Sequence, residues 1–153
     1  MIVQFFSRGK GRGAGPIDYL LGRQRDRPLA TLLRGDADET EALIDSSRND
    51  KKYTSGCLSF EESNIDEAQK QALMDSFETC LFAGLDFDQY NCLWVEHRDK
   101  GRLELNFVIP NIELTTGKRL QPYYHTAEIK RVDAWRTIQN LTYGFSDPDD
   151  PFK

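Results

Sequence analysis

The sequence predicts an α+β fold, a largely antiparallel sheet with its helices on one face. Two observations support this. Strand-like and helix-like segments follow in the order βαβαβαββα, and the last two predicted strands are joined by a short turn, as in a hairpin. A chain of 153 residues forms one domain with a core of its own. The other face of the sheet would then be free for a site.

The first half begins with a strand over residues 2–7, "IVQFFS", which is rich in β-branched and aromatic residues. The glycine-rich "RGKGRGAG" follows and predicts a flexible basic loop. Pro16 suits the first position of a helix, "PIDYLLG", that stops at Gly22. Residues 31–35 form a short strand. Asp36 and Glu39 then fit a capping box for a helix through about Ser46.

The second half begins with a longer strand over residues 51–62, after which Ser63 and Asp66 cap a helix that runs to Gly84. Residues 90–97 and 102–114 form the hairpin, and a last helix spans about 127–143. The apolar stripes of the two helices keep helical spacing. They comprise Ala68, Ala72, Leu73, Phe77, Cys80 and Leu81, and then Ile129, Val132, Trp135, Ile138 and Leu141.

We expect a folded domain over residues 1–146. The acidic, proline-containing residues 147–153 look like the start of a linker toward a further C-terminal region. No apolar run is long enough for a membrane span and the start lacks the layout of a signal peptide, so a cytoplasmic protein is expected. The three cysteines (Cys57, Cys80, Cys92) lack metal-site spacing, which favours buried reduced thiols.

Charge is distributed unevenly along the chain. The net charge is −5, yet residues 1–35 carry seven Arg and Lys against Asp18 and Asp26, a balance of +5 that leaves −10 for the rest. Such a chain can present a local anion-binding surface despite its overall sign. A solvated N-terminal loop explains the same charges equally well.

The predicted hairpin, "HRDKGRLELNFVIPN", carries polar residues in an apolar strand. A turn over residues 98–101 pairs His97 with Arg102, Val95 with Glu104 and Leu93 with Asn106. Because cross-strand partners share a face, His97, Glu104 and Asn106 would project together, while Trp94, Leu103, Leu105 and Phe107 pack under the helices.

The turn length decides whether these polar residues form a site, because an odd-length turn would direct His97 away. With the even turn, an imidazole nitrogen, a carboxylate and an amide oxygen converge, which suits Mg²⁺ or Mn²⁺. A solvent-facing polar strand explains the same three residues.

Two segments resemble a known family. "GPIDYLLG" and "EHRDKGRLELNFVIPNIELTTGKRLQPYY" are similar to the plasmid mobilization relaxases of small colicin-type plasmids, in the HUH-endonuclease superfamily. The resemblance implies a palm-like antiparallel sheet. It also implies a metal, Mg²⁺ or Mn²⁺, on a His–Glu–Asn triad formed by His97, Glu104 and Asn106, and a nicking tyrosine at Tyr19. The histidine–hydrophobe–histidine motif of most of the superfamily is absent.

The function implied is metal-dependent nicking and rejoining of one DNA strand at a plasmid transfer origin through a 5′-phosphotyrosyl intermediate. Glu61 or Glu62 is the candidate that orients the site or accepts the proton. The cluster of Tyr123, Tyr124 and His125 is expected to shape the DNA groove or the edge packing, with a second nucleophile as the alternative. The resemblance also implies single-stranded origin DNA, accessory mobilization proteins, a coupling protein and a type IV secretion system as partners.

Basic residues beside the tyrosine and around the hairpin are expected to hold the DNA phosphates, with some bases stacked on aromatic side chains. They are Arg8, Lys10, Arg12, Arg23, Arg25, Arg27, Arg98, Lys100, Arg102, Lys118 and Arg119.

Three alternatives remain open. A rolling-circle replication initiator shares the nicking chemistry, but its tyrosine usually follows the metal motif, whereas Tyr19 precedes it. A single-stranded nucleic-acid-binding module would lack catalysis. A metal-dependent hydrolase would use water and leave no covalent adduct.

Overall fold

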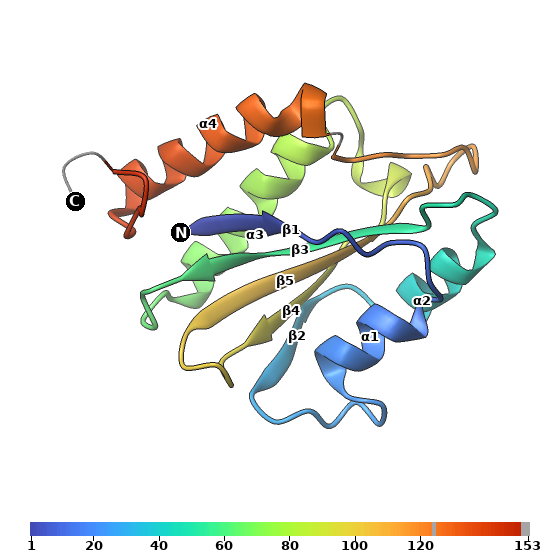
Figure 1. The fold of residues 1–153 in the computed structure, drawn as a ribbon, viewed down its shortest axis with the longest axis horizontal. Coiled ribbons are helices and arrows are strands. Elements are labelled where there is room, and N and C mark those ends of the chain that lie inside the picture. The colour runs from blue at the N-terminus through green and yellow to red at the C-terminus, as the bar shows by residue number, and fades with distance from the viewer. Residues whose placement is uncertain (124, 151–153) are drawn as a thin grey trace.

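The computed structural model describes residues 1–123 and 125–150, and the side chains of all of these except His125 and Thr126. Its centre is an antiparallel sheet with the strand order β1-β3-β5-β4-β2, which confirms the predicted α+β class (Figure 1). The strands are β1 (Ile2–Phe5), β2 (Ala30–Arg34), β3 (Tyr53–Phe60), β4 (Leu93–His97) and β5 (Leu103–Pro110). The helices are α1 (Ala14–Leu21), α2 (Ala37–Ser46), α3 (Glu67–Leu81) and α4 (His125–Tyr143), with a short 3₁₀ helix, η1 (Phe87–Gln89).

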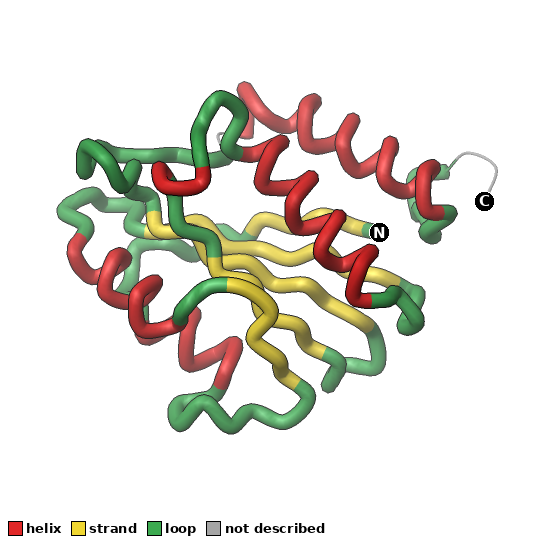
Figure 2. Tube along the Cα trace, turned by 180° about the vertical axis from the view of Figure 1, so that it is seen from behind, coloured by secondary structure: helices red, strands yellow, loops and turns green. Residues whose placement is uncertain are grey.

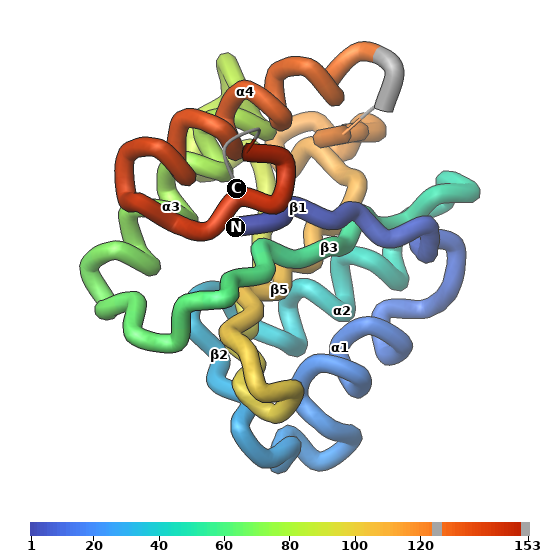
Figure 3. The backbone as a smooth tube through the Cα atoms, turned by 60° about the vertical axis from the view of Figure 1, so that its left-hand side comes forward, coloured from blue at the N-terminus to red at the C-terminus, as the bar shows by residue number. Residues whose placement is uncertain are grey.

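The helices cover both faces of the sheet, which corrects the expectation of helices on one face. Figure 3 shows α3 and α4 on one side and α1 and α2 on the other. The physical reason is that the second face is also apolar, because Leu93, Val95 and Val108 project from it and are buried under Ile17 and Ile44. The second face is therefore open only where α1 and α2 leave it uncovered.

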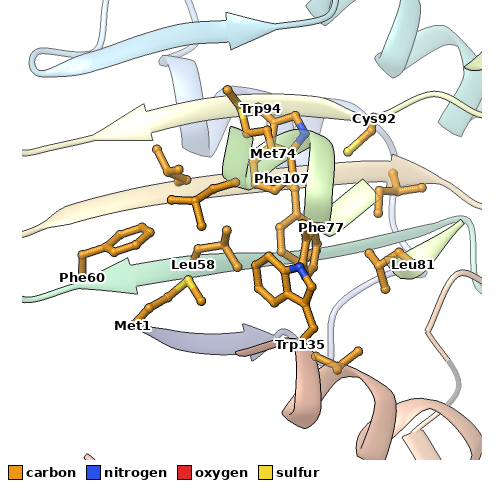
Figure 4. Packing of buried hydrophobic residues seen from close by; sticks show 14 of the residues in the cluster. Met1, Leu58, Phe60, Met74, Phe77, Leu81, Cys92, Trp94, Phe107 and Trp135 are labelled. Carbon is orange, nitrogen blue, oxygen red and sulfur yellow. The ribbon is translucent and has the colours of Figure 1, made fainter. Parts of the chain in front are cut away.

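The larger core lies under α3 and α4. Aromatic rings fill its centre, and Phe77 of α3 packs against Phe107 and Trp135 with ring centroids 4.9 and 5.1 Å apart (Figure 4). Trp94 of β4 completes this group 5.6 Å from Phe77. Figure 2 shows α3 crossing the back of the sheet, with α4 along its edge. The predicted burial of Trp94, Leu103, Leu105 and Phe107 on this side is confirmed.

The apolar stripe predicted for α3 is wrong in part. Ala68 and Ala72 are exposed, whereas Lys70 and Glu78 are buried. The buried polar groups are paired: Lys70 with Glu96 of β4, and Glu78 with the Tyr90 hydroxyl (2.9 Å), the Trp94 ring N–H (3.0 Å) and Arg34 (2.7 Å). Paired charges can occupy a helix face that apolar periodicity reserves for hydrophobic residues.

The stripe predicted for α4 holds only at its centre. Val132 and Trp135 are buried, but Ile138 and Leu141 are 57% and 79% exposed. At this end Asn140 faces the molecule and donates to the Met1 carbonyl at 3.1 Å, and Tyr143 packs against the core, so Ile138 and Leu141 lie on the outer side of the helix.

The N-terminal basic loop is anchored at two points, although its glycines suggested flexibility. The Gly9 carbonyl accepts hydrogen bonds from the backbone N–H groups of Lys52 and Tyr53, and Gly13 N–H donates to Asp45 Oδ1 at 2.8 Å. A Cβ on Gly9 would lie 2.5 Å from the Tyr53 carbonyl oxygen, so only glycine fits there. The helix begins two residues before Pro16, which therefore lies within its first turn rather than at its start.

Asp36 and Asp66 cap their helices as predicted, but the details of each cap differ. Asp36 accepts from the Glu39 N–H at 2.9 Å, and Asp66 forms a complete capping box with Gln69, while Ser63 lies outside the helix. β5 ends at Pro110, four residues before the predicted strand end.

The C-terminal end of the described chain packs against α4. Arg136 forms ion pairs with Asp147 and Asp149, both at 3.0 Å, so packed structure continues into the predicted linker. All three cysteines are free thiols; Cys57 and Cys92 are buried and Cys80 is half-buried. Within the described residues, no helix has both the length and the apolar character to cross a membrane.

Candidate active site

The hairpin register differs by two residues from the predicted one. His97 lies opposite Glu104 and Val95 opposite Asn106, so the predicted turn over residues 98–101 and its cross-strand pairs are wrong. A shift of two preserves the side-chain alternation, and His97, Glu104 and Asn106 therefore share one face as expected. This register places Trp94 opposite Phe107 in the aromatic core, with ring centroids 5.4 Å apart.

His97 is held in a defined orientation by α1. Its Nε2 lies 2.7 Å from the Leu20 carbonyl oxygen, which can only accept, so Nε2 carries the proton. Nδ1 is then a free acceptor, and it is buried without a hydrogen-bond partner among the described residues. Burial lowers the pKa of His97, which favours the neutral imidazole that metal binding requires.

The other two predicted ligands also present acceptors to this face. Glu104 Oε1 is buried without a hydrogen bond in the described chain, and its nearest cation, the Lys100 ammonium, is 3.6 Å away. Asn106 donates through Nδ2 to the Val95 carbonyl at 3.3 Å, which leaves its side-chain oxygen as an acceptor. Burial raises the pKa of the neighbouring Cys57 thiol to about 12, which favours the neutral thiol over the thiolate.

These three side chains fit a small divalent cation. One neutral imidazole nitrogen, one carboxylate and one amide oxygen form a mixed, oxygen-rich donor set, and two of the three residues carry buried acceptor atoms with no hydrogen bond. Among the described residues, no three His, Cys, Asp or Glu side chains group to hold a metal ion, so the amide of Asn106 is needed as the third donor.

Tyr19 projects from α1 beside this group. The neighbouring Ile17, Leu20 and Leu21 bury the opposite side of the helix, which leaves the tyrosine 48% exposed. Its ring lies edge-on to His97 with centroids 6.3 Å apart, and Lys100 Nζ donates to its hydroxyl at 3.1 Å. The nucleophile and metal ligands expected from the sequence are thus brought together.

Arg27 and Asp99 join the two loops around Tyr19. Arg27 Nη2 and Nε lie 2.7 and 3.0 Å from Asp99 Oδ2 in the β4–β5 loop. The same guanidinium donates to the Tyr19 carbonyl oxygen and lies 5.0 Å from the centre of its ring. Sequence reasoning counted Arg27 only among basic residues and did not identify Asp99, because nothing local relates positions so far apart in the chain.

Glu62 lies with other neighbours. Its Oε1 accepts from the Ser146 N–H at 2.6 Å, and the N-terminal amine of Met1 donates to the Ser146 carbonyl. None of the contacts described for Glu62 reaches Tyr19, His97 or Glu104. Glu61 is exposed at the end of β3. A catalytic role for either carboxylate remains a prediction that these contacts do not support.

The predicted DNA-binding cations fall into two groups. Arg25 is paired with Asp18, Asp38 and Glu41, while Arg98 and Lys100 lie beside Glu96 and Glu104. Arg27 is paired with Asp99. The other seven make no ion pair with a described residue: Arg8, Lys10, Arg12, Arg23, Arg102, Lys118 and Arg119.

Lys118 and Arg119 lie away from the β4–β5 loop, with which the sequence grouped them. They follow β5, whereas the loop precedes it, so the length of the strand separates the two (Figure 1). Their segment lies at the end of the sheet where the basic loop is anchored, since Lys52 contacts both Gly9 and Asn111.

The expected tyrosine and histidine cluster is only partly described. Tyr123 stacks on Phe5 with centroids 3.7 Å apart, which agrees with the expectation of edge packing. Tyr124 and the side chain of His125 lie outside the described part of the chain, so the alternative of a second nucleophile there stays a prediction.

Comparison with known proteins places the chain in a family. Residues 33–143 match the family model described as "Relaxase: MobA/VirD2-like, nuclease domain", a region that contains the hairpin and begins after Tyr19. The chain is 78% identical over 153 residues to a protein named "Cryptic plasmid protein C" from Neisseria gonorrhoeae, of which it covers 75%. It is 58% identical over 151 residues to "DNA relaxase MbeA" from Escherichia coli.

The chain spans 29% of that second relative's length, although the match includes 99% of the chain itself. No solved structure matches it. The family match covers well over half of the sequence, and the two relatives extend the likeness across Tyr19 and the N-terminal loop. The chain therefore belongs to the MobA/VirD2-like relaxases, as the nuclease domain of a DNA relaxase.

Proposed function

We propose that this domain nicks and rejoins one DNA strand at a plasmid transfer origin by transesterification on Tyr19. The observation that carries the proposal is the position of the Tyr19 hydroxyl, which is open to solvent, hydrogen-bonded to Lys100 at 3.1 Å and next to the face that carries His97, Glu104 and Asn106. A nucleophile, a cation and a set of free acceptors are the parts such a reaction needs.

In the proposed reaction, Tyr19 Oη loses its proton to solvent and attacks the scissile phosphorus, and the bond from phosphorus to the 3′ oxygen breaks as that oxygen takes up a proton from solvent. The products are a 5′-phosphotyrosyl link and a free 3′-hydroxyl. One phosphoester replaces another, so the reverse reaction can rejoin the strand.

The ammonium of Lys100 faces the phenolic oxygen and stabilises negative charge on it, both during attack and when the tyrosine leaves in the reverse step. The His97 ring and the guanidinium of Arg27 limit the positions available to the Tyr19 ring. A neutral phenol is a weak nucleophile, so this local cation is the activation that the chain itself supplies.

We further propose that His97, Glu104 and Asn106 hold Mg²⁺ or Mn²⁺, which would polarise the non-bridging phosphate oxygens and neutralise charge in the transition state. Single-stranded origin DNA is the proposed substrate. Accessory mobilization proteins, a coupling protein and a type IV secretion system are the proposed partners, and the reaction belongs in the bacterial cytoplasm.

The test uses short single-stranded DNAs that tile a mobilizable plasmid's transfer origin, with Mg²⁺, Mn²⁺ or EDTA, resolved on denaturing gels. We expect a DNA–protein adduct that needs metal and is lost in Tyr19→Phe. Tyr143→Phe, on α4, is the matched control and should form the adduct at the normal rate.

DNA binding without an adduct under any metal would overturn the catalytic assignment and favour the non-catalytic binding module. Cleavage without an adduct would instead favour a hydrolase that uses water. An adduct retained in Tyr19→Phe would place the nucleophile elsewhere.

A further inference from the structure

A cleft of about 620 Å³ opens beside Tyr19 on the second face of the sheet. Its walls are formed by residues 5–8, at the end of β1 and just after it, and by α1, and its floor is formed by β3 and β5. Tyr19 and Asn106 both line it, so the cleft is continuous with the candidate active site. Its volume lies within the range of pockets that enclose small organic ligands.

An aromatic ring on the cleft wall is exposed without an evident structural need. Phe6 is 40% exposed although its backbone N–H is hydrogen-bonded to the Ser55 carbonyl at 2.9 Å. This bond fixes the backbone that carries the ring, so the ring is presented to the cleft from an ordered segment. Such rings stack on nucleic-acid bases at little entropic cost.

The floor of the cleft provides an unused hydrogen-bonding group. Ser55 is 7% exposed and shares a face with Val108, its partner on β5. Its hydroxyl makes no hydrogen bond to another described residue. A buried hydroxyl facing a cleft favours a ligand with a polar edge over a purely apolar one.

The cleft suits a base better than a row of phosphates. Phe6, Pro16, Leu20 and Val108 make much of its lining apolar, and Arg8 is the one cation among the described residues that line it. Tyr53 adds an aromatic side chain whose pKa is raised by burial. Flat apolar walls, a polar floor and one rim cation match a nucleobase with its attached phosphate.

We propose that this cleft binds the base of the nucleotide next to the scissile phosphate, stacked on Phe6 with its edge toward Ser55, while Arg8 contacts a flanking phosphate. The inference rests on the proposed function and deepens it, because it assigns a residue-level site for strand selection. Occupation of the cleft would position the phosphate against Tyr19.

The experiment measures binding of a fluorescent origin strand in EDTA, so that cleavage does not interfere. Abasic sites are introduced singly at each position near the cleaved phosphate, and each strand is measured with the unmodified protein and with Phe6→Ala. We expect one adjacent position at which loss of the base weakens binding by about tenfold in the unmodified protein but has little further effect in Phe6→Ala.

Phe87→Ala is the matched control, because Phe87 is an even more exposed phenylalanine on η1, away from the cleft. It should retain the full loss at that position. Ser55→Ala should change which of the four bases is preferred at that position. Its effect on the loss of affinity caused by base removal should be smaller than that of Phe6→Ala. Melting temperatures close to the unmodified protein's would show that the variants fold.

If removing a base weakens binding by the same factor in Phe6→Ala as in the unmodified protein at every position, the base site is refuted. It is also refuted if Phe87→Ala reduces the effect of base removal as much as Phe6→Ala does. Either result leaves the adduct assay with Tyr19 unaffected, so failure of this inference is distinguishable from failure of the proposed nicking function.

Discussion

Lys100 links the proposed nucleophile, Tyr19, to the face that carries the proposed metal ligands. Its ammonium donates to the Tyr19 hydroxyl at 3.1 Å and lies 3.6 Å from Glu104 Oε1. The hydrogen bond with Tyr19 is the leading reason that the pKa of Lys100 is raised, so the side chain stays charged. The sequence indicated Lys100 only as a DNA-binding cation.

At this scale we expect Lys100→Met to lower the rate of adduct formation by about 100-fold at saturating DNA, because one donor to a developing charge is removed. Lys100→Arg should retain most of the rate. Single-turnover kinetics across DNA concentrations provide the measurement.

Lys118→Met is the control, since Lys118 lies at the other end of β5. If Lys100 only contacts DNA, the affinity of Lys100→Met will fall while its saturated rate stays normal, which would contradict the assigned role.

At the scale of elements, the site depends on two loops from different parts of the chain. The α1–β2 loop contributes Arg27 and the β4–β5 loop contributes Asp99, and their ion pair is partly shielded. Because Arg27 also contacts Tyr19, the pair fixes the end of α1 against the hairpin. Neither loop alone would orient the tyrosine.

We expect Asp99→Asn to reduce the saturated nicking rate about tenfold by loosening Tyr19, while a partly exposed pair costs less than about 1 kcal/mol of stability. The rate is measured in single turnover and the free energy of unfolding in urea.

Asp38→Asn is the matched control, because it removes an exposed carboxylate from the Arg25 pair without touching Tyr19. Equal rate losses in both variants would contradict the positioning role, as would a loss fully explained by unfolding.

For the whole molecule, a net charge of −5 coexists with a cationic end of the sheet. Arg8, Lys10 and Arg12 in the anchored loop lie at the end to which residues 111–121 also return. Positive charge that is unpaired within the described chain attracts phosphates, whereas Arg25 is already neutralised by three carboxylates.

We therefore expect DNA affinity to fall steeply with salt. Arg12→Gln should reduce the slope of log affinity against log salt by about 0.7, as expected for one lost phosphate contact on a single strand. Arg25→Gln should leave the slope unchanged. Anisotropy titrations at several salt concentrations test both, and salt-independent affinity would refute the cationic surface.

Much of the candidate site could be predicted from the sequence, because the face to which a strand residue points depends on its position along that strand. Alternation along β5 put Glu104 and Asn106 on one face, and the even register shift kept His97 with them. The stripes of α3 and α4 were harder to predict, since burial of Lys70 and Glu78 depends on partners in β4 and β2. The hairpin register places Trp94 opposite Phe107 in the aromatic core, a long-range contact that the turn residues do not specify.

The sequence by itself determined the antiparallel α+β class, the elements in their order, and the residues that the relaxase resemblance assigns to the site. Only the tertiary structure decided that helices cover both faces, that His97 donates to Leu20, that Arg27 meets Asp99, and that a cleft opens at Phe6. The physical reason is that strand alternation and helix capping are governed by near neighbours, whereas these contacts join residues that only chain folding brings together.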